Sequence, residues 1–146
     1  MSFLIHTHSG LRWVALILLI VAISNAVGKL KSGSYVKKDK MINLFAMIVL
    51  HIQLVIGLIL YFISNRVTFE SGWMKVPATR FFGMEHLAGM LIAIILVTIG
   101  RRKAENATLE NKKHKAIVVW YTIGLILILA SIPWPFRENL GISAWF

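Results

Sequence analysis

Two long stretches without a single charged residue limit what this chain can fold into. Residues 41–65 and 116–136 contain 25 and 21 uncharged, mostly apolar residues. A helix needs about 20 residues to cross the hydrocarbon core of a bilayer. Lipid cannot satisfy free backbone groups, so an open chain crosses it only as a helix. These stretches therefore predict membrane-spanning helices and argue against a soluble domain.

Two further apolar stretches complete the predicted fold. One begins beside Arg12, which can extend its charge to the membrane surface, and the other includes Glu85. Pro133 and Pro135 are expected to end the last helix. We expect an all-α, polytopic membrane protein, a single domain in which four transmembrane helices form an up-down-up-down bundle. The predicted spans are residues 11–28, 41–64, 81–100 and 116–134, and an interfacial C-terminal tail, residues 136–146, follows.

The basic residues predict how the bundle lies in the membrane. Eleven of the 16 Lys and Arg residues fall in two loops, residues 29–40 and 101–115. By the positive-inside rule these loops face the cytoplasm, so loop 65–80 and both termini face outward. The formal net charge of +10 is thereby explained without nucleic acid. Binding of anionic lipid or of a protein partner is the alternative role for the basic loops.

The chain contains no cysteine, which excludes several kinds of site. Disulfides, thiolate zinc sites, iron–sulfur clusters and covalently attached haem all need cysteine. The sequence also has no Gly-rich phosphate loop, no Ser-His-Asp arrangement and no His-Glu-x-x-His helix. A metal or haem must then be held by other side chains, and electron transfer is a better expectation than substrate chemistry.

Three histidines are the candidate metal ligands. His51 is the eleventh residue of its uncharged span, about 15 Å of helix from one end and about 21 Å from the other. At that depth it must form a hydrogen bond within the bundle or bind a ligand. His86 lies about one helical turn from the depth of His51, so the two could bind one metal ion. His8 is the other possible partner of His86, because the first and third helices lie diagonally across a bundle.

The surroundings of the histidines support a bulky ligand. Gly83 and Gly89 lie three residues on either side of His86 and clear space near its helix face. Tight helix packing through small residues is the alternative explanation. His114, by contrast, lies in a Lys-rich loop, and we expect it to be at the surface.

Two arginines are predicted at the same membrane boundary as His8 and His86. The guanidinium groups of Arg12 and Arg80 could pair with the propionates of a haem, since a guanidinium matches a carboxylate in a two-pronged geometry. An ion pair between Arg12 and Glu85 is the alternative for those two residues.

Several of these segments also resemble one family. They are residues 8–13 (HSGLRW), 51–62 (HIQLVIGLILYF), 85–86 (EH) and 132–136 (IPWPF). Over essentially the whole chain, they resemble small bacterial four-helix membrane proteins labelled cytochrome b. The resemblance implies a protein of the bacterial plasma (inner) membrane with non-covalent haem b, and His8, His51 and His86 are the matching histidines. The chain lacks the two matched histidine pairs of a two-haem transmembrane cytochrome, so one haem is expected.

Three functions are compatible with these observations. The first is a b-type haem electron carrier or small respiratory-complex subunit that passes electrons between quinone in the bilayer and a larger complex. The second is a cofactor-free membrane subunit or assembly factor, whose polar residues only fasten the helices together. The third is a transporter or enzyme that moves protons or a divalent metal, which fits least because the spans contain few acids.

Overall fold

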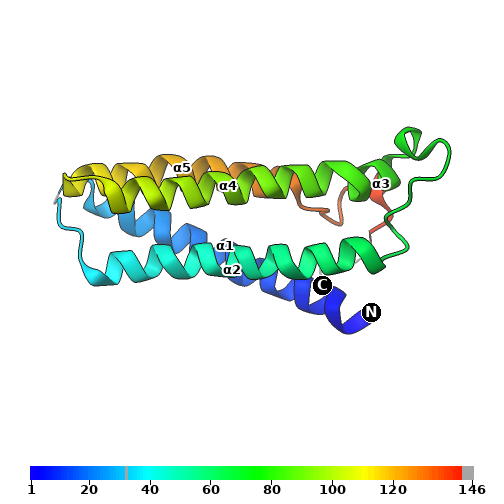
Figure 1. Ribbon diagram of the computed structural model, residues 1–146, viewed down its shortest axis with the longest axis horizontal. Coiled ribbons are helices and arrows are strands. Elements are labelled where there is room, and N and C mark those ends of the chain that lie inside the picture. Colours follow the sequence, from blue (N-terminus) through cyan, green and yellow to red (C-terminus); the bar gives the residue numbers. More distant parts are fainter. Residues whose placement is uncertain (32, 143–146) are drawn as a thin grey trace.

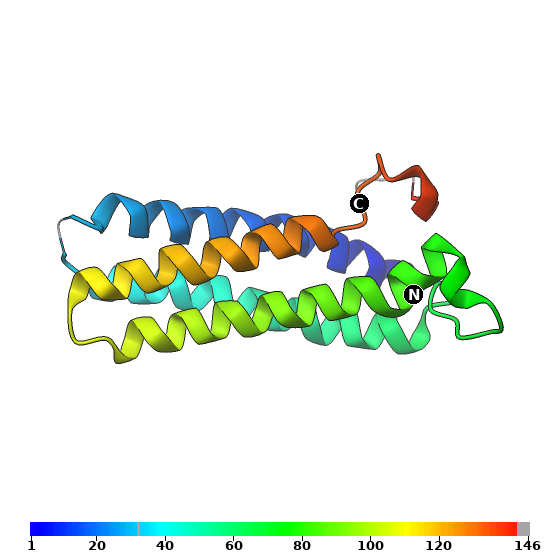
Figure 2. The same cartoon turned by 90° about the horizontal axis from the view of Figure 1, so that it is seen from above.

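The computed structural model describes residues 1–31 and 33–142, and most of them are helical (Figure 1). Four helical segments are long and apolar enough to cross a membrane. Figures 1 and 2 show that successive long helices run in opposite directions. The predicted all-α fold with four spanning helices is therefore confirmed. The long helices are α1 (Ser2–Lys29), α2 (Lys37–Ile63), α4 (His86–Asn106) and α5 (Glu110–Ser131).

The helices extend beyond the predicted spans. The first begins at Ser2 instead of residue 11, and the two basic loops shrink to residues 30–36 and 107–109. Hydropathy marks where a helix leaves the hydrocarbon, whereas Lys, Arg and Glu are good helix formers that continue it into the polar region. At its other end α5 stops at Ser131, three residues before the predicted end of the span at residue 134 and two residues before Pro133.

The approach to α4 is irregular. A 3-10 turn (Trp73–Lys75), the short helix α3 (Pro77–Arg80) and a π-helical turn (Phe81–Glu85) lead directly into it. In the π-helical turn the backbone N–H of His86 donates to the carbonyl of Phe81, five residues back. Such turns are wider than an α-helical turn and occur often at functional sites. The one in this chain directly precedes His86.

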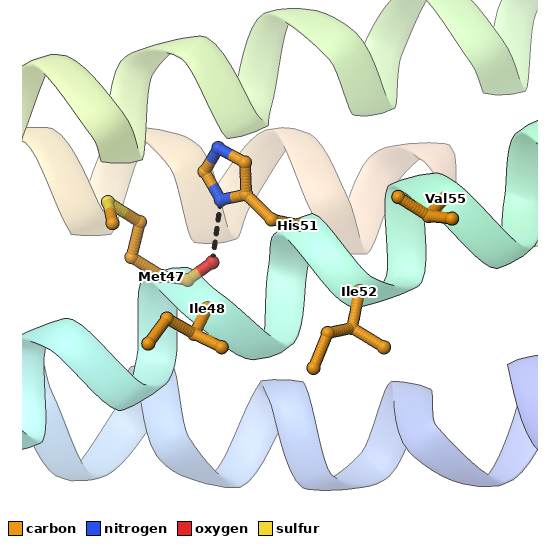
Figure 3. Close-up of a pocket in the computed structure, with 5 residues that line it drawn as sticks. All are labelled: Met47, Ile48, His51, Ile52 and Val55. Carbon is orange, nitrogen blue, oxygen red and sulfur yellow. Dashed lines mark hydrogen bonds between the residues drawn. The ribbon is translucent and has the colours of Figure 1, made fainter.

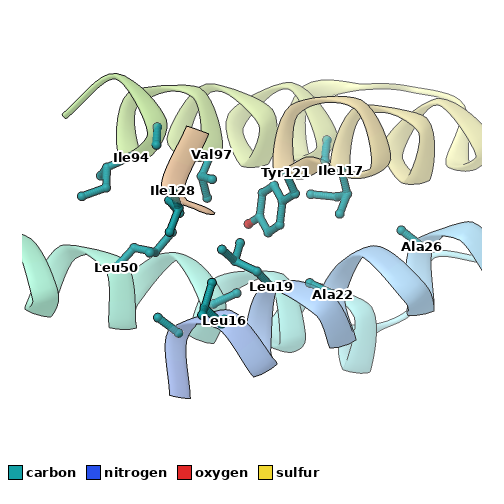
Figure 4. Close-up of a cluster of buried hydrophobic side chains, with 14 of the residues drawn as sticks. Leu16, Leu19, Ala22, Ala26, Leu50, Ile94, Val97, Ile117, Tyr121 and Ile128 are labelled. Carbon is teal, nitrogen blue, oxygen red and sulfur yellow. The ribbon is translucent and has the colours of Figure 1, made fainter. Parts of the chain in front are cut away.

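The four helices form a ring in which each packs against two neighbours. The neighbouring pairs are α1 with α2, α2 with α4, α4 with α5, and α5 with α1, so α1 and α4 are diagonal. Small residues such as Ala22, Ala46 and Ala93 are fully buried and allow the backbones to approach. Figure 4 shows the larger side chains that fill the core between them, among which Leu19 and Tyr121 are completely buried.

Large apolar side chains cover the outer faces of the bundle. A contiguous apolar surface of this kind would promote aggregation in water, but in a bilayer it contacts lipid. The four apolar helices therefore fit a multi-pass membrane protein. Exposed examples from three helices are Ile17, Ile20, Val55, Phe62, Ile123 and Ile126.

The C-terminal segment folds back over one end of the bundle. Its 3-10 turn (Glu138–Leu140) contacts α3, and Leu140 is buried. The guanidinium of Arg137 lies 4.7 Å from the ring centroid of Phe81. Part of the tail that was predicted to lie at the membrane surface thus packs against the protein itself. The predicted tail continues through residues 143–146, which lie outside the described residues.

Candidate functional site

Two histidines meet at the end of the bundle where the chain begins, which we call the histidine end. The rings of His8 on α1 and His86 on α4 have centroids 6.3 Å apart, with an angle of 78° between their planes. They approach each other across the diagonal of the bundle. Of the two partners that the sequence left open for His86, the structure brings His8 close.

His86 is held by the neighbouring helix α5. Its Nδ1 lies 2.7 Å from the carbonyl oxygen of Ser131, the last residue of α5. A carbonyl can only accept, so Nδ1 carries the hydrogen and donates it. The other ring nitrogen, Nε2, is then left with a lone pair and can bind a metal ion. Histidine ligands in metal sites usually have this arrangement, in which the second nitrogen donates to a carbonyl or a carboxylate.

His8 is held by α2 in a different way. Its ring packs against the α-carbon of Gly57, where an added Cβ would lie 3.1 Å from the Cε1 atom of His8. The side-chain amide of Gln53 donates to the backbone carbonyl of His8 over 2.9 Å. His8 Nδ1 and Gln53 Oε1 are buried and have no hydrogen-bond partner within the described part of the chain. Buried polar atoms of this kind point to a missing ligand or water molecule.

A cavity of about 330 Å³ runs along the bundle beside both histidines. On α2 its lining extends from Leu50 to Tyr61, a distance of about 17 Å along a helix axis, and Ser64 follows just after the helix. The inner part is apolar and includes Met90 and Ile94, whereas Tyr61 and Ser64 make the end near the loop more polar. The cavity therefore suits an elongated ligand with an apolar body and a polar end.

These residues fit a haem better than a bare metal ion. When two imidazoles bind one metal ion from opposite sides, each through a nitrogen at about 2.0 Å, their ring centroids lie about 6 Å apart. The rings of His8 and His86 have this separation. Within residues 1–31 and 33–142, no three His, Cys, Asp or Glu side chains form a metal-binding group. Two protein ligands are enough for haem iron, because the macrocycle supplies the other four. The volume is at the lower end for ligand pockets, so flexible side chains such as Met90 must move to admit a porphyrin.

Only one of the two predicted arginines lies at the cavity. Arg12 lines the cavity, and its guanidinium lies 5.5 Å from the ring centroid of Trp13 and 5.9 Å from that of Trp134. Arg80 does not line the cavity, because its Nε forms an ion pair of 2.6 Å with Glu85. This pair also replaces the predicted one between Arg12 and Glu85. The second arginine of the cavity is Arg66 at the polar end, which the sequence analysis missed.

His51 does not join the site. It is exposed on the outer face of α2, in a surface pocket with Met47, Ile48, Ile52 and Val55 (Figure 3). Its Nδ1 donates to the carbonyl of Met47, one turn earlier in the same helix, over 2.8 Å. Of the two alternatives for His51, the structure shows the hydrogen bond within the bundle, formed inside its own helix, and His51 does not lie beside His86 at the cavity. A histidine in a helix can hydrogen-bond to a carbonyl of the preceding turn. Its depth in the membrane does not show which face of the helix it lies on.

The two glycines near His86 do not clear space for a ligand. A Cβ on Gly83 would lie 3.2 Å from the indole of Trp73, and one on Gly89 would overlap Ser131. Both positions serve tight packing, which was the alternative explanation. The carbonyl of Gly83 also accepts a hydrogen bond of 2.8 Å from the hydroxyl of Tyr61.

The opposite end of the bundle, which we call the basic end, also buries polar side chains. Contrary to the prediction, His114 is completely buried, and its Nε2 bonds to the carbonyl of Ser34 over 2.6 Å. The helices continue past the hydrocarbon boundary, so a residue in a Lys-rich segment can still face inward. Asp39 is also completely buried and accepts hydrogen bonds from Asn25, Lys29 and the backbone of Val36.

Tyr35 joins the two basic loops at this end. Its hydroxyl donates to Glu105 over 3.1 Å and accepts from Asn43 over 3.2 Å. Glu105 also forms an ion pair of 2.8 Å with Lys40. Burial of the phenol, with the nearby carboxylate of Glu105, raises the pKa of Tyr35 to about 12. This network ties Tyr35 to α2 and α4.

One signal in the sequence could have found more of the site. Gln53, Gly57 and Tyr61 are spaced four residues apart on α2, so they share one helix face. In the structure all three line the cavity, whereas His51 lies off this face.

Comparison of the chain with family models, with curated proteins and with solved structures found no match. The site therefore has to be interpreted from its own geometry.

Proposed function

We propose that this protein is a membrane-embedded b-type haem protein that carries electrons, and that His8 and His86 are the axial ligands. The observation that supports this most is the pair of imidazoles 6.3 Å apart beside an elongated, mostly apolar cavity. Haem iron, when bound, supplies the one-electron chemistry. The protein supplies the two ring nitrogens, excludes water and holds His86 through Ser131.

The cations at the site suit the acidic groups of haem. Arg12 and Arg66 both line the cavity, and a guanidinium pairs with a carboxylate through two parallel hydrogen bonds. The two indoles beside Arg12 limit its conformations and keep its charge at the cavity wall. In this proposal the two arginines bind the propionates.

The proposal includes an orientation in the membrane. The basic end faces the cytoplasm of a bacterial cell, because it holds 11 of the 16 basic residues of the chain. Both termini and the histidine end then face outward across the plasma membrane. Electrons are exchanged with quinone in the bilayer or with a larger respiratory complex.

The orientation can be tested on single-cysteine variants, because the chain has no native cysteine. Ser34→Cys at the basic end should react with a membrane-impermeant thiol reagent only after the cells are opened. Glu138→Cys at the histidine end should react in intact spheroplasts. The reverse pattern would overturn the orientation and leave the haem site untouched.

The haem proposal is tested by the absorption spectrum of protein purified with haem available, before and after dithionite. The wild type should show a Soret band that shifts on reduction. His8→Ala and His86→Ala should lose it, and His51→Ala should keep it because His51 lies on the outer face. A wild type without a Soret band would overturn the haem proposal, and the chain would then be a cofactor-free membrane subunit or assembly factor.

A further inference from the structure

Three glycines allow α4 and α5 to pack closely, and one of them adjoins His86. They are Gly89 and Gly100 on α4 and Gly124 on α5, and at each an added Cβ would meet a side chain of the facing helix. At Gly89 that side chain is Ser131. Since residues three apart in a helix share a face, Gly89 brings Ser131 to the face that carries His86.

The carbonyl of Ser131 is free to accept because of the prolines that follow it. Ile132 precedes Pro133 and is extended, with a ψ of 136°, so α5 stops at Ser131. The last carbonyls of a helix have no N–H of a following turn to accept from, and those of Leu129 and Ser131 are among them. The indole of Trp134 donates to Leu129 over 2.8 Å, and His86 Nδ1 donates to Ser131 over 2.7 Å.

We infer that Gly89 is a positioning residue for His86. The end of α5 before Pro133 leaves the Ser131 carbonyl free, Gly89 lets it approach α4, and the resulting hydrogen bond fixes His86 with its proton on Nδ1 and its lone pair on Nε2. This inference rests on the proposed haem site. It gives the end of α5 before Pro133 a further role: it orients an axial ligand and makes that ligand a stronger electron donor.

The first test uses haem-free protein with 15N-labelled histidine, in which the His86 signals are assigned by their loss in His86→Ala. In the wild type the proton should reside on Nδ1. Gly89→Ala pushes Ser131 away, so the two nitrogens should show a mixture of tautomers. Gly124→Ala is the matched control: its Cβ would lie 2.7 Å from Val97 in the same interface, but far along the helices from His86.

The second test uses the haem-loaded protein. Loss of a hydrogen bond to a metal-binding histidine weakens metal binding by about 10-fold to 100-fold, so Gly89→Ala should raise the haem dissociation constant about 10-fold. It should also raise the midpoint potential, since a less basic ligand stabilises the oxidised iron less. Adding Ser131→Gly to Gly89→Ala removes the clash but keeps the carbonyl, and should restore both values.

The outcomes separate this inference from the proposal on which it rests. A wild type without haem overturns the haem site, and the tautomer of His86 in the haem-free protein then still decides whether Gly89 positions it. A Gly89→Ala protein with the wild-type tautomer overturns the positioning role, whether or not haem binds. Equal effects of Gly89→Ala and Gly124→Ala on the potential would also overturn it.

Discussion

The two ends of the bundle differ in what surrounds their buried polar side chains. At the basic end, the carboxylate of Asp39 is matched by Lys29 and Asn25, so its buried charge is neutralised within the protein. At the histidine end, His8 and His86 face a cavity, and His8 Nδ1 has no partner within the described residues. Unpartnered buried polar atoms occur at both ends, since Asn43 Oδ1 and His114 Nδ1 at the basic end have no partner within the described residues either. The cavity is what distinguishes the ends, because it is lined by His8 and His86 and by neither Asn43 nor His114. The basic end therefore matches a buried charge within the protein, and the histidine end is where we propose that a ligand binds.

The largest effect that would sharpen this comparison is expected at Asp39. Asp39→Ala leaves the partly buried ammonium of Lys29 without its carboxylate, which should lower the free energy of unfolding by about 3 kcal/mol. Unfolding in mixed micelles with increasing denaturing detergent measures this. The exposed Glu70→Ala at the other end is the control, with an expected change within about 0.5 kcal/mol. If Asp39→Ala removed haem from protein that stays folded, the basic end would be part of the functional site.

The next effect is expected at Gly57. In Gly57→Ala the new methyl group would displace the ring of His8 by a few tenths of an ångström, since the Cβ would lie 3.1 Å from Cε1. We expect the haem dissociation constant to rise about 10-fold, as for other disturbances next to a metal ligand. Titration of haem into the purified protein measures it. Gly28→Ala, whose Cβ would contact nothing within 4 Å, should bind haem as the wild type does.

A smaller effect is expected at Tyr35. Tyr35→Phe removes the hydrogen bonds with Glu105 and Asn43 and should cost about 1 kcal/mol of stability, without changing the haem spectrum. The folded pKa of about 12 lies above the ordinary 10.0 of the phenol, so folding favours the neutral form. This contribution is complete below pH 10 and is lost as the pH rises through 12. Stability measured between pH 9 and 12 should therefore fall less in Tyr35→Phe than in the wild type.

The smallest effect is expected at His51. His51→Leu replaces an exposed, locally bonded imidazole on the outer face of α2 and should change stability by about 0.5 kcal/mol or less. The Soret band should be retained in full. A collapse of expression or a loss of haem would contradict the division between the two ends, because it would make the outer face of α2 essential.

Much of the fold was predictable because hydropathy and charge act along the chain. The uncharged runs determined the number of spanning helices, the prolines after Ser131 determined where α5 ends, and the basic loops marked one end of the bundle. The histidine end was also predictable in part. His8 and His86 lie near the same ends of diagonal helices, and this placement follows from the order of the spans alone.

Only the tertiary structure decided which way the side chains face. In a soluble helix the polar face points outward, and the pattern of the sequence reveals the buried side. In a membrane helix both faces are apolar, so the rotation of each helix is set by packing between small residues and by a few polar contacts. This is why His51 faces outward and His114 faces inward, although depth along the chain suggested otherwise. Arg66 lies in the turn after α2, and its place at the cavity depends on the path of that turn, which hydropathy does not reveal.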